Sequence, residues 1–590
     1  MPYNIPMNLT TLSPTSLDNP LYYLRNAQQV IQLCLNQYAD LLRPDEIKQL
    51  EQLLSLDEPA QALLIRMVMR KGVLFRQDNL SYNEVPDLQA ALQHLLAAGL
   101  IDDQPVLSLE ALCDLCRREE CLLLARHRLP ENRLTASMRK SDLLAVLLEQ
   151  DADQQSLHSW WPEPPFELVE LRCNSLFDRL RLMFFGNLYQ SWSEFVLTEL
   201  GLQQFEPVLF TSESRPFQRR DEVDLYLQLQ RLREQVVAGE DIEAVSQSLP
   251  EPIDCDWIHY RYQKVLFQLG REAERRQQIE LALQLYQQSQ HREAQLRTLR
   301  LPRKRESPER VFTLATQAYA QLLQPEIRVG LQRIQQRCAR KAGLDYRPPE
   351  SIKVPVHSLT LPKPAHGRVE NAVIEHLSDT DTQLFHVENQ LFTGLFALLI
   401  WPALYTPLRG AFFNPFQSGP ADLFRPGFTE GRSELIESAF QQLLTGAYRD
   451  TILQHFEQKQ GISCALIYWP SLQPELIETA LELIPATHLE AIFQHLLLDL
   501  RHHRRGLPDL IELNRATGCY RLIEVKGPGD RLQDHQRLWI QAMLEHDIPV
   551  SVLQVAGMRQ TCESSRTLLV RVCRTRRQPG TSLHALTYNG

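Results

Sequence analysis

Apolar residues recur at helical spacing through the first third of the chain. The stretches "PDEIKQLEQLLSL" and "DLQAALQHLLAAGLI" put leucine, isoleucine and alanine on one face and polar residues opposite, which predicts amphipathic helices. Between them, residues 62–82 mix basic and apolar positions, and the extended stretch "GLIDDQPVLSL" follows. This order favours a winged-helix-like unit, and a helical bundle with a solvated basic face fits the same pattern equally well.

Basic side chains in this part of the chain are candidate DNA contacts. Three of them, Arg70, Lys71 and Arg76, belong to the mixed stretch, while Arg139 and Lys140 lie in "LTASMRKSDLLAVLLEQ". The latter is typical of a small helix pair that rests on a DNA backbone. The Pro-rich "WWPEPPFELVEL" indicates a linker. We therefore expect an N-terminal helical domain over residues 1–60 and a winged-helix-like, DNA-binding region over residues 61–160.

The middle of the chain is helical by pattern, with few glycines and many glutamine, leucine, arginine and alanine residues. The stretch "REAERRQQIELALQLYQQSQHREAQLRTLR" has the small-residue and tyrosine spacing of helix-pair repeats, although no clean period emerges. Arrays of helix pairs commonly hold partners or flanking domains in place. We expect residues 161–345 to form such an array.

The last part of the chain has an α/β pattern. It follows the Pro-rich "YRPPESIKVPVHSLTLPKP" and begins with an apolar helix near residues 388–405. Two short apolar runs then precede the helical "DRLQDHQRLWIQAMLEHD" and the strand-like "IPVSVLQVAG". Strand, strand, helix and strand, with polar residues gathered at one end, is the layout of a catalytic core, which we expect over residues 346–590.

Charge is unevenly distributed along the chain. The net charge is 62 − 72 = −10, whereas residues 501–590 hold 14 Lys/Arg and 8 Asp/Glu, a local excess of 14 − 8 = +6. A basic segment in an acidic protein suits a phosphate-rich partner.

The eleven cysteines are scattered, as expected of reduced thiols in a soluble cytosolic protein. Cys113, Cys116 and Cys121 lack a second ligand pair at zinc spacing, which favours buried helix cysteines. No secretory signal is evident at the N-terminus. The most apolar stretch, residues 391–405, contains Pro402 and is too short to cross a bilayer, so no membrane partner is expected.

The two apolar runs within "GLPDLIELNRATGCYRLIEVKG", residues 506–527, carry charged residues at their ends. Glu524 and Lys526 are two apart on one strand and share a face, which Asp509 joins if its strand pairs alongside. Two carboxylates suit Mg²⁺ or Mn²⁺, and the metal would stabilise charge on a scissile phosphate. Lys526 would orient the attacking hydroxide or stabilise the transition state. The alternative is an exposed strand edge with an ordinary salt bridge.

The motif "RHHRRG" precedes this strand pair and adds Arg501, Arg504 and Arg505 as candidate phosphate contacts beside the cut. A Pro-Asp pair alone is a weak signal, because "VPDLQAAL" has one in a helical context. The two apolar strands and the basic surroundings make the signal at Asp509 stronger.

"GLPDLIEL" followed by "LIEVKGPGDRLQDHQRLW" resembles the VRR-NUC branch of the PD-(D/E)xK nucleases, including the residues Gln536 and Trp539. Residues 62–85, 180–201 and 386–405 also resemble the Fanconi-associated nuclease family in its bacterial form. The resemblance covers nearly the full length. It implies a winged-helix/SAP-like DNA-binding region, a TPR-like helical domain and a C-terminal α/β PD-(D/E)xK nuclease core.

The resemblance also implies an activity: a structure-selective, Mg²⁺- or Mn²⁺-dependent phosphodiesterase that cuts near 5′ flaps, trims DNA in the 5′-to-3′ direction and repairs interstrand crosslinks. Its partner would be branched or flapped DNA, and its location the cytoplasm, at the nucleoid during repair. The residues that match the family's site are the metal carboxylates Asp509 and Glu524, the catalytic Lys526, a further acid Glu388 on the preceding helix, and the Val525 carbonyl. Gln536 is carried over as a DNA contact. No set of Cys and His matches the ubiquitin-binding zinc finger of the animal relatives, which puts ubiquitin-dependent recruitment in doubt.

Several alternatives remain open. A non-catalytic DNA-binding scaffold with a nuclease-like fold would be expected to lose one of Asp509, Glu524 and Lys526, whereas all three are present. Cleavage of matched DNA and RNA flaps would distinguish a DNA nuclease from an RNA-directed nuclease. A repeat-based adaptor protein would leave the strand-pair motif unexplained. Glu388 could favour the positive end of a helix dipole, and the family resemblance favours its metal role.

Overall fold

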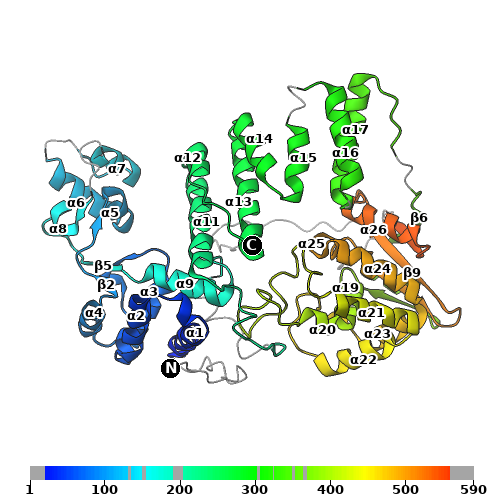
Figure 1. The fold of residues 1–590 in the computed structure, drawn as a ribbon, viewed down its shortest axis with the longest axis horizontal. Helices are drawn as coiled ribbons and strands as arrows, with labels where there is room; N and C mark the ends of the chain where they lie inside the picture. The colour runs from blue at the N-terminus through cyan, green and yellow to red at the C-terminus, as the bar shows by residue number, and fades with distance from the viewer. Residues whose placement is uncertain are drawn as a thin grey trace, which may run out of the picture.

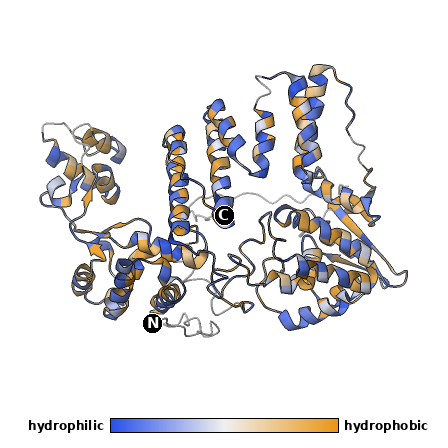
Figure 2. Ribbon diagram, in the orientation of Figure 1, coloured by the Kyte–Doolittle hydropathy of each residue, from blue (hydrophilic) through white to orange (hydrophobic). Residues whose placement is uncertain are grey.

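We analysed a computed structural model, which describes residues 20–130, 134–148, 154–190, 204–301, 306–322, 324–348, 352–362 and 368–558. Figure 1 shows an N-terminal helical part, a row of helices in the middle of the chain, and a C-terminal part built on a sheet. Orange and blue alternate on the middle helices in Figure 2, as expected of amphipathic helices. The resembling stretch 180–201 lies partly outside the described residues.

Helices and a small sheet form the first unit. The helices are α1 (Tyr22–Tyr38), α2 (Pro44–Ser55), α3 (Glu58–Val68) and α4 (Leu88–Ala97), with the 3-10 turns η2 (Ala39–Leu41) and η3 (Gln77–Asn79). The sheet has the antiparallel order β1 (Leu74–Arg76), β5 (Leu168–Leu171), β2 (Ile101–Asp102). The presence of this sheet separates the unit from the purely helical bundle that the sequence also allowed.

The second unit has its own apolar core and is inserted between β2 and β5. It consists of β3 (Val106–Leu107), α5 (Leu109–Leu115), α6 (Arg118–Arg128), α7 (Lys140–Leu148), β4 (Gln155–Ser156) and α8 (Leu157–Trp160). Cys113, Cys116 and Cys121 are buried in this core, where structural cysteines were expected. The central strand β5 of the first sheet therefore comes from chain that follows the second unit.

The middle helices are α9 (Asn174–Phe185), α11 (Arg220–Ala238), α12 (Ile242–Gln247), α13 (Asp256–Arg275), α14 (Ile279–Gln288), α15 (Arg292–Arg300), α16 (Pro308–Gln321) and α17 (Pro325–Ala342). They stand side by side in a row that includes the pairs α13–α14 and α16–α17, except for α9, which lies against α1 of the first unit (Figure 1). A Cβ at Gly270 of α13 would lie 2.8 Å from the Tyr286 ring of α14, so this glycine permits the close approach. The small-residue and tyrosine spacing in the sequence thus marks a helix-pair contact.

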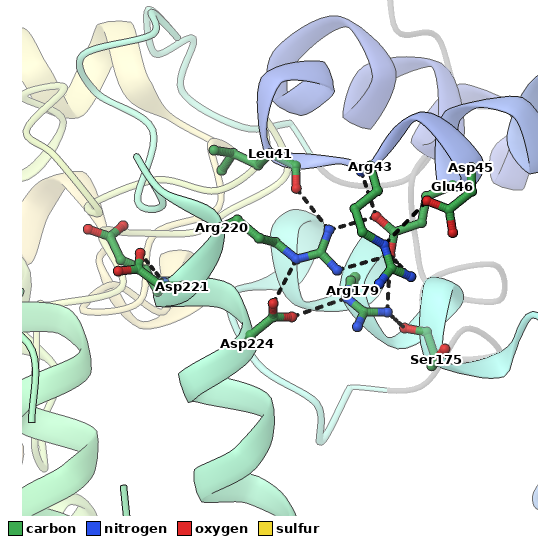
Figure 3. Close-up of polar contacts among 10 residues, drawn as sticks. Leu41, Arg43, Asp45, Glu46, Ser175, Arg179, Arg220, Asp221 and Asp224 are labelled. Carbon is green, nitrogen blue, oxygen red and sulfur yellow. Dashed lines mark hydrogen bonds and ion pairs between the residues drawn. The ribbon is translucent and has the colours of Figure 1, made fainter. Parts of the chain in front are cut away.

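Buried charges join the first unit to the middle helices (Figure 3). Glu46 of α2 receives hydrogen bonds from Arg220 of α11 at 2.6 and 3.0 Å and lies 3.3 Å from Arg179 of α9. One hydrophobic core joins α1 to α4 of the first unit with α9 and with α11 to α15. The domain boundaries expected near residues 60, 160 and 345 stay a prediction.

The C-terminal part contains a five-stranded mixed sheet of order β6 (Val356–Pro362), β10 (Val550–Met558), β9 (Cys519–Lys526), β8 (Leu510–Asn514), β7 (Thr382–His386). Pairs β6–β10 and β10–β9 are parallel, while β9–β8 and β8–β7 are antiparallel. The helices are α18 (Val369–Leu377), α19 (Leu391–Leu399), α20 (Trp401–Leu404), α21 (Ser433–Thr445), α22 (Tyr448–Lys459), α23 (Pro474–Leu483), α24 (Ala486–Leu498), α25 (Leu500–His503), α26 (Asp534–Glu545) and the 3-10 turn η5 (Trp469–Ser471). The expected order of strand, strand, helix and strand is confirmed by β8, β9, α26 and β10.

Apolar side chains cover both faces of this sheet. Helix α18 covers one face through Val373, and the larger core with α19, α24 and α26 covers the other. The apolar stretch 391–405 is divided into α19 and α20 and is buried, as expected. In the described part of the chain, no helix combines the length and apolarity needed to cross a membrane.

Polar contacts tie the middle helices to the sheet domain. Arg292 of α15 donates to Asp499, and Glu326 of α17 lies 3.2 Å from His503. Asp499 is the N-cap of α25 and His503 is its last residue. These contacts therefore position the segment that leads into β8 and hence into the site.

Candidate active site

The pairing of β8 with β9 brings the three charged residues of the strand motif together. The ladder pairs Leu510 with Ile523, and one further step places Asp509 opposite Glu524. Opposite residues of an antiparallel pair share a face, and Lys526 shares it with Glu524 because it is two positions along. The side chains therefore converge at the end of the sheet, on the face covered by α26.

Asp509 takes the place of a missing strand partner. Strand β8 begins at Leu510, so β9 extends past it, and the Asp509 Oδ2 accepts the Val525 N–H at 2.8 Å. The N–H and C=O of one residue in a strand point to the same edge, so the Val525 carbonyl also faces Asp509.

Glu524 is fully buried and holds two donors on one oxygen. Its Oε1 lies 2.7 Å from the Lys526 Nζ and accepts the Gln536 Nε2–H of α26 at 2.6 Å. Its Oε2 has no hydrogen-bond partner among the described residues. The Gln536 Oε1 accepts the Gln533 N–H at 3.0 Å, so the first turn of α26 orients this amide toward Glu524.

The Asp509 and Glu524 carboxyl groups are both buried and lie close to other negatively charged groups. Burial raises the pKa of Asp509 to about 6, although the hydrogen bond from the Val525 N–H lowers it. The charge of Glu388 adds to the rise. Burial and then the charge of Asp509 raise the pKa of Glu524 to about 7, which the Lys526 hydrogen bond only partly offsets. One ammonium group thus serves three carboxylates, and the site favours an additional cation.

Glu388 does not lie on a helix, and that prediction was wrong. His386 is the last residue of β7 and pairs with Leu510, while Glu388 lies in the turn before α19 begins at Leu391. The strand pairing of β7 overrides the helical pattern of this stretch. The Glu388 side chain is 45% exposed and accepts a hydrogen bond from Asn389 at 3.2 Å. Its negative charge adds to the rise in the pKa of both Asp509 and Glu524, so Glu388 lies close enough to act on the pair electrostatically.

The donors present fit a hard divalent cation. The unpartnered, buried Glu524 Oε2, the Asp509 carboxylate and the Val525 carbonyl are all oxygen atoms, which Mg²⁺ and similar ions prefer. In the ranges that the structure describes, no group of three His, Cys, Asp or Glu side chains is close enough to form a complete cage. Asp509, Glu524 and the Val525 carbonyl are the groups that would hold such an ion.

A tight loop brings this site against α26. Gly506 has φ +90°, and a Cβ there would lie 2.5 Å from His535. The Trp539 indole N–H donates to the carbonyls of His503 and Arg505 at 2.9 and 3.1 Å. The close contact at Gly506 and the hydrogen bonds of Trp539 explain why both residues belong to the motif.

The Fanconi-associated nuclease 1 homolog of Pseudomonas aeruginosa is 41% identical to this chain, over 92% of the chain and 96% of the relative. The chain belongs to the Fanconi-associated nuclease 1 family. Residues 21–102 match the model of the "FAN1, HTH domain", residues 106–160 that of the "Fanconi anemia-associated nuclease SAP domain", and residues 445–557 that of the "VRR-NUC domain". An Arabidopsis thaliana homolog is 24% identical over 90% of this chain and 67% of its own.

Solved structures of a family member share the fold over most of this chain. The crystal structure of paFAN1 bound to 2nt 5′ flap DNA with gap has a TM-score of 0.81 and 40% identity, covering 92% of this chain and 100% of that one. Its complex with 1nt 5′ flap DNA with gap has a TM-score of 0.80. The resemblance stated from the motifs is confirmed: the protein is a DNA repair nuclease of the Fanconi-associated nuclease 1 family with a VRR-NUC domain. A nuclease of this PD-(D/E)xK type depends on a divalent metal.

The basic residues predicted beside the cut follow α24. Arg501 and Arg504 both contact Phe424: the Arg501 Nε donates to its carbonyl at 3.1 Å, and the Arg504 guanidinium lies 4.3 Å from its ring centroid. Arg505 is exposed. Burial and then the charges of Arg505 and Arg501 lower the pKa of Arg504. Within the described ranges none of the three forms an ion pair with a carboxylate, so they remain candidates for phosphate.

The basic residues predicted in the first two units differ in their surroundings. Arg70, Lys71 and Arg139 are exposed, and Lys140 donates to the Asp114 carbonyl at 3.3 Å. Arg76 is only 6% exposed and holds Asp78 and Glu120, each at 2.7 Å, above the Phe166 ring. Arg76 therefore joins the first two units through Glu120, and this pairing does not favour its predicted DNA contact, which stays a prediction.

Sequence reasoning missed a cation-lined cavity of about 510 Å³ between α9, α13 and the sheet domain. The Arg425 guanidinium lies 3.3 Å from the Trp257 ring centroid and 4.7 Å from that of Tyr260. Burial, and then the charges of Arg501 and other arginines, lower the pKa of Lys264. The stretch "DWIHYRYQK", with aromatic and basic residues interleaved, carries a signal for this cavity, but its partner Arg425 is remote in sequence.

Proposed function

We propose that this protein is a structure-selective, Mg²⁺- or Mn²⁺-dependent DNA nuclease that cuts near 5′ flaps, trims the product in the 5′-to-3′ direction, and acts in interstrand crosslink repair. The observation that carries the proposal is the Asp509, Glu524 and Lys526 cluster, in which a buried carboxylate oxygen lacks a partner among the described residues. The 5′ flap DNA present in the paFAN1 structures supports a branched DNA substrate. The proposed location is the cytoplasm, at the nucleoid during repair.

Each residue of the cluster has a proposed task. Asp509, Glu524 and the Val525 carbonyl would hold the metal, with Glu388 contributing charge or a water-bridged ligand from the neighbouring turn. The bound metal would supply Lewis-acid stabilisation of the phosphate and a water of lowered pKa. Lys526, held by Glu524 at 2.7 Å, would orient the attacking water or stabilise the developing negative charge. Gln536 fixes the rotamer of Glu524, so we propose a positioning role in place of direct DNA contact.

The basic surfaces would hold the phosphate backbone. Arg504 and Arg505 flank the catalytic loop, while Arg501 lines the cation-rich cavity with Lys264 and Arg425. These positions support a DNA path that crosses α25 on its way to the cluster. In the N-terminal units, Arg70, Lys71, Arg139 and Lys140 are proposed to contact duplex phosphates.

One experiment tests the proposed function directly. Purified protein is incubated with labelled 5′-flap, 3′-flap and duplex DNA, in Mg²⁺, Mn²⁺ or EDTA, and with a 5′-flap RNA of matched sequence. We expect cleavage of the 5′-flap DNA that depends on the metal. Equal cleavage of the RNA would indicate an RNA-directed nuclease, and tight binding without cleavage in either metal would indicate a DNA-binding scaffold.

The role of Glu388 has its own test. Glu388→Gln keeps the size of the side chain and removes its charge, so cleavage should fall about 10²-fold while the melting temperature stays the same. Glu375→Gln, on the exposed side of α18, is a matched control that should leave cleavage unchanged. Normal cleavage by Glu388→Gln would show that Glu388 has no role in the metal site and is only a residue of the turn.

A further inference from the structure

A second groove, of about 350 Å³, opens beside the catalytic centre. One wall is the turn at Asn389, a second is formed by Arg504 and Arg505, and the third includes Tyr468. Asn389 joins the first two walls, because its Oδ1 accepts the Leu507 N–H at 3.1 Å. The groove therefore shares its walls with the turn of Glu388 and the loop that leads to Asp509.

The Tyr468 ring stands in the open on a fixed backbone. Its carbonyl accepts the N–H and the hydroxyl of Ser471 at 3.0 and 2.8 Å, and the neighbouring Trp469 indole donates to the Ile462 carbonyl at 2.6 Å. The residue is 60% exposed, and in the described part of the chain its side chain makes no hydrogen bond or ring contact. An exposed aromatic ring that is already held in place loses little entropy when a flat ligand stacks on it.

Arg505, which lines the same groove, has a similar arrangement. Its carbonyl is held by the Trp539 indole at 3.1 Å, whereas its guanidinium is exposed and pairs with no carboxylate among the described residues. Arg505 precedes Asp509 by four residues, so their Cα atoms are at most about 14 Å apart. Along the axis of a duplex, where one strand advances about 3.4 Å per nucleotide, that distance spans at most about four nucleotides.

We propose that this groove binds one nucleotide of the substrate DNA strand within four positions of the cut, with its base stacked on Tyr468 and its phosphate held by Arg505. The inference rests on the proposed nuclease function and adds a positioning site to it. Stacking of a base on an aromatic ring tolerates any sequence, as a nuclease that selects structure requires. Holding this nucleotide would align the scissile phosphate with the metal cluster.

The test combines a variant of the protein with a DNA substrate that lacks one base. A single abasic nucleotide is moved through the four positions on each side of the cut in a 5′-flap substrate, and kcat/KM is measured for the wild type and Tyr468→Ala. We expect kcat/KM of the wild type to fall about tenfold when the abasic nucleotide occupies one of these positions. Tyr468→Ala should be about tenfold slower on the intact flap and show no additional decrease at that position. Tyr468→Phe keeps the ring and should behave as the wild type.

Two results would overturn the proposal: Tyr468→Ala cutting the intact flap at the wild-type rate, or slowing by a further tenfold at the same abasic position. Leu444→Ala, at another exposed apolar residue of the sheet domain, controls for surface truncation and should match the wild type. A second readout avoids cleavage. In the Asp509→Asn background, 2-aminopurine at the sensitive position should be quenched on binding, and Tyr468→Ala should abolish the quenching. Absence of any cleavage by the wild type would reject the proposed function, while this binding arm would still decide the stacking.

Discussion

Glu46 and Glu524 are both withdrawn from water, with exposed side-chain fractions of 3% and 0%, yet their charge balance is opposite. Glu46 meets Arg220, Arg179 and Arg43, and also accepts the Arg43 N–H at 2.8 Å (Figure 3). Burial opposes ionisation of Glu46, but these hydrogen bonds and charges outweigh it and lower its pKa. Glu524 has one ammonium partner, a second carboxylate nearby and a pKa raised to about 7.

The difference separates a structural carboxylate from a reactive one. Three guanidinium groups satisfy Glu46, and the cluster stabilises the junction of α2, α9 and α11 without affinity for another ion. The Asp509 and Glu524 pair is left short of positive charge, so the folded protein carries an electrostatic cost until a cation binds. Burial alone does not distinguish the two; the number and sign of the partners do.

The largest expected effect comes from neutralising the reactive carboxylates. Asp509→Asn and Glu524→Gln should each lower cleavage by about 10³-fold or more, because each removes a charge that holds the metal. In metal-free buffer, calorimetry should show that neither variant unfolds at a lower temperature than the wild type, since a like-charge repulsion is relieved. A variant that keeps rapid cleavage would remove that residue from the site.

Neutralising the structural carboxylate should have the opposite outcome. Glu46→Gln removes the buried anion that three guanidinium groups share and leaves Arg179 and Arg220 with Asp224 and Arg43 with Asp45. The free energy of unfolding should therefore fall by about 3 kcal/mol. Cleavage by the protein that remains folded should be unchanged. Asp45→Asn is the matched control, because the Asp45 side chain is 64% exposed and its pair with Arg43 is worth less than about 1 kcal/mol. Denaturant unfolding of the two variants side by side measures the difference.

The two sites should respond to pH with opposite signs. Asp509 and Glu524 have pKa values of about 6 and about 7, above their ordinary values of 3.8 and 4.5. The folded protein therefore binds more protons than the unfolded chain between about pH 4 and pH 7, and this contribution to stability falls as pH rises. Glu46 contributes stability above its ordinary pKa of 4.5, and that contribution is lost as pH falls below it.

A bound metal ion should cancel the loss of stability that the Asp509–Glu524 pair causes as pH rises. Raising the pH of metal-free protein from 5.5 to 8 should cost roughly 3 kcal/mol at the Asp509–Glu524 centre, seen as a lower melting temperature. Saturating Mg²⁺ or Mn²⁺ should restore it in the wild type and fail to do so in Glu524→Gln. The same metal response in Glu524→Gln would place the cation elsewhere.

The smallest expected effect concerns the basic surfaces. Replacing Arg501, Arg504 and Arg505 with alanine should weaken binding to every DNA sequence alike and reduce the slope of log K against log salt by about 1 for each phosphate that the protein no longer neutralises. Arg76→Ala should leave this slope unchanged and lower stability, because its guanidinium is occupied by Asp78 and Glu120. An unchanged slope in the triple variant would show that the motif only faces solvent.

The linear sequence was enough to find the strand pair of the site. Two short apolar runs mark β8 and β9 as strands, and the strand period of two then places Glu524 and Lys526 on one face. The same local logic marks α26, the buried α19 and the helix pairs of the middle region, since each depends on spacing within one segment.

The sequence did not determine which charged groups meet across the fold. Arg76 and Arg70 are six residues apart in one basic stretch, and only the packing of α6 against β1 gives Arg76 the partner Glu120. Glu388 lies in a stretch with a helical pattern. However, β7 pairs with β8 as far as His386, so Glu388 falls in the turn after the strand and not in a helix. The charge balance of Glu524, and the groove beside it, also depend on residues brought from remote segments. Electrostatics and strand pairing act through space, so their outcome was decided by the tertiary structure.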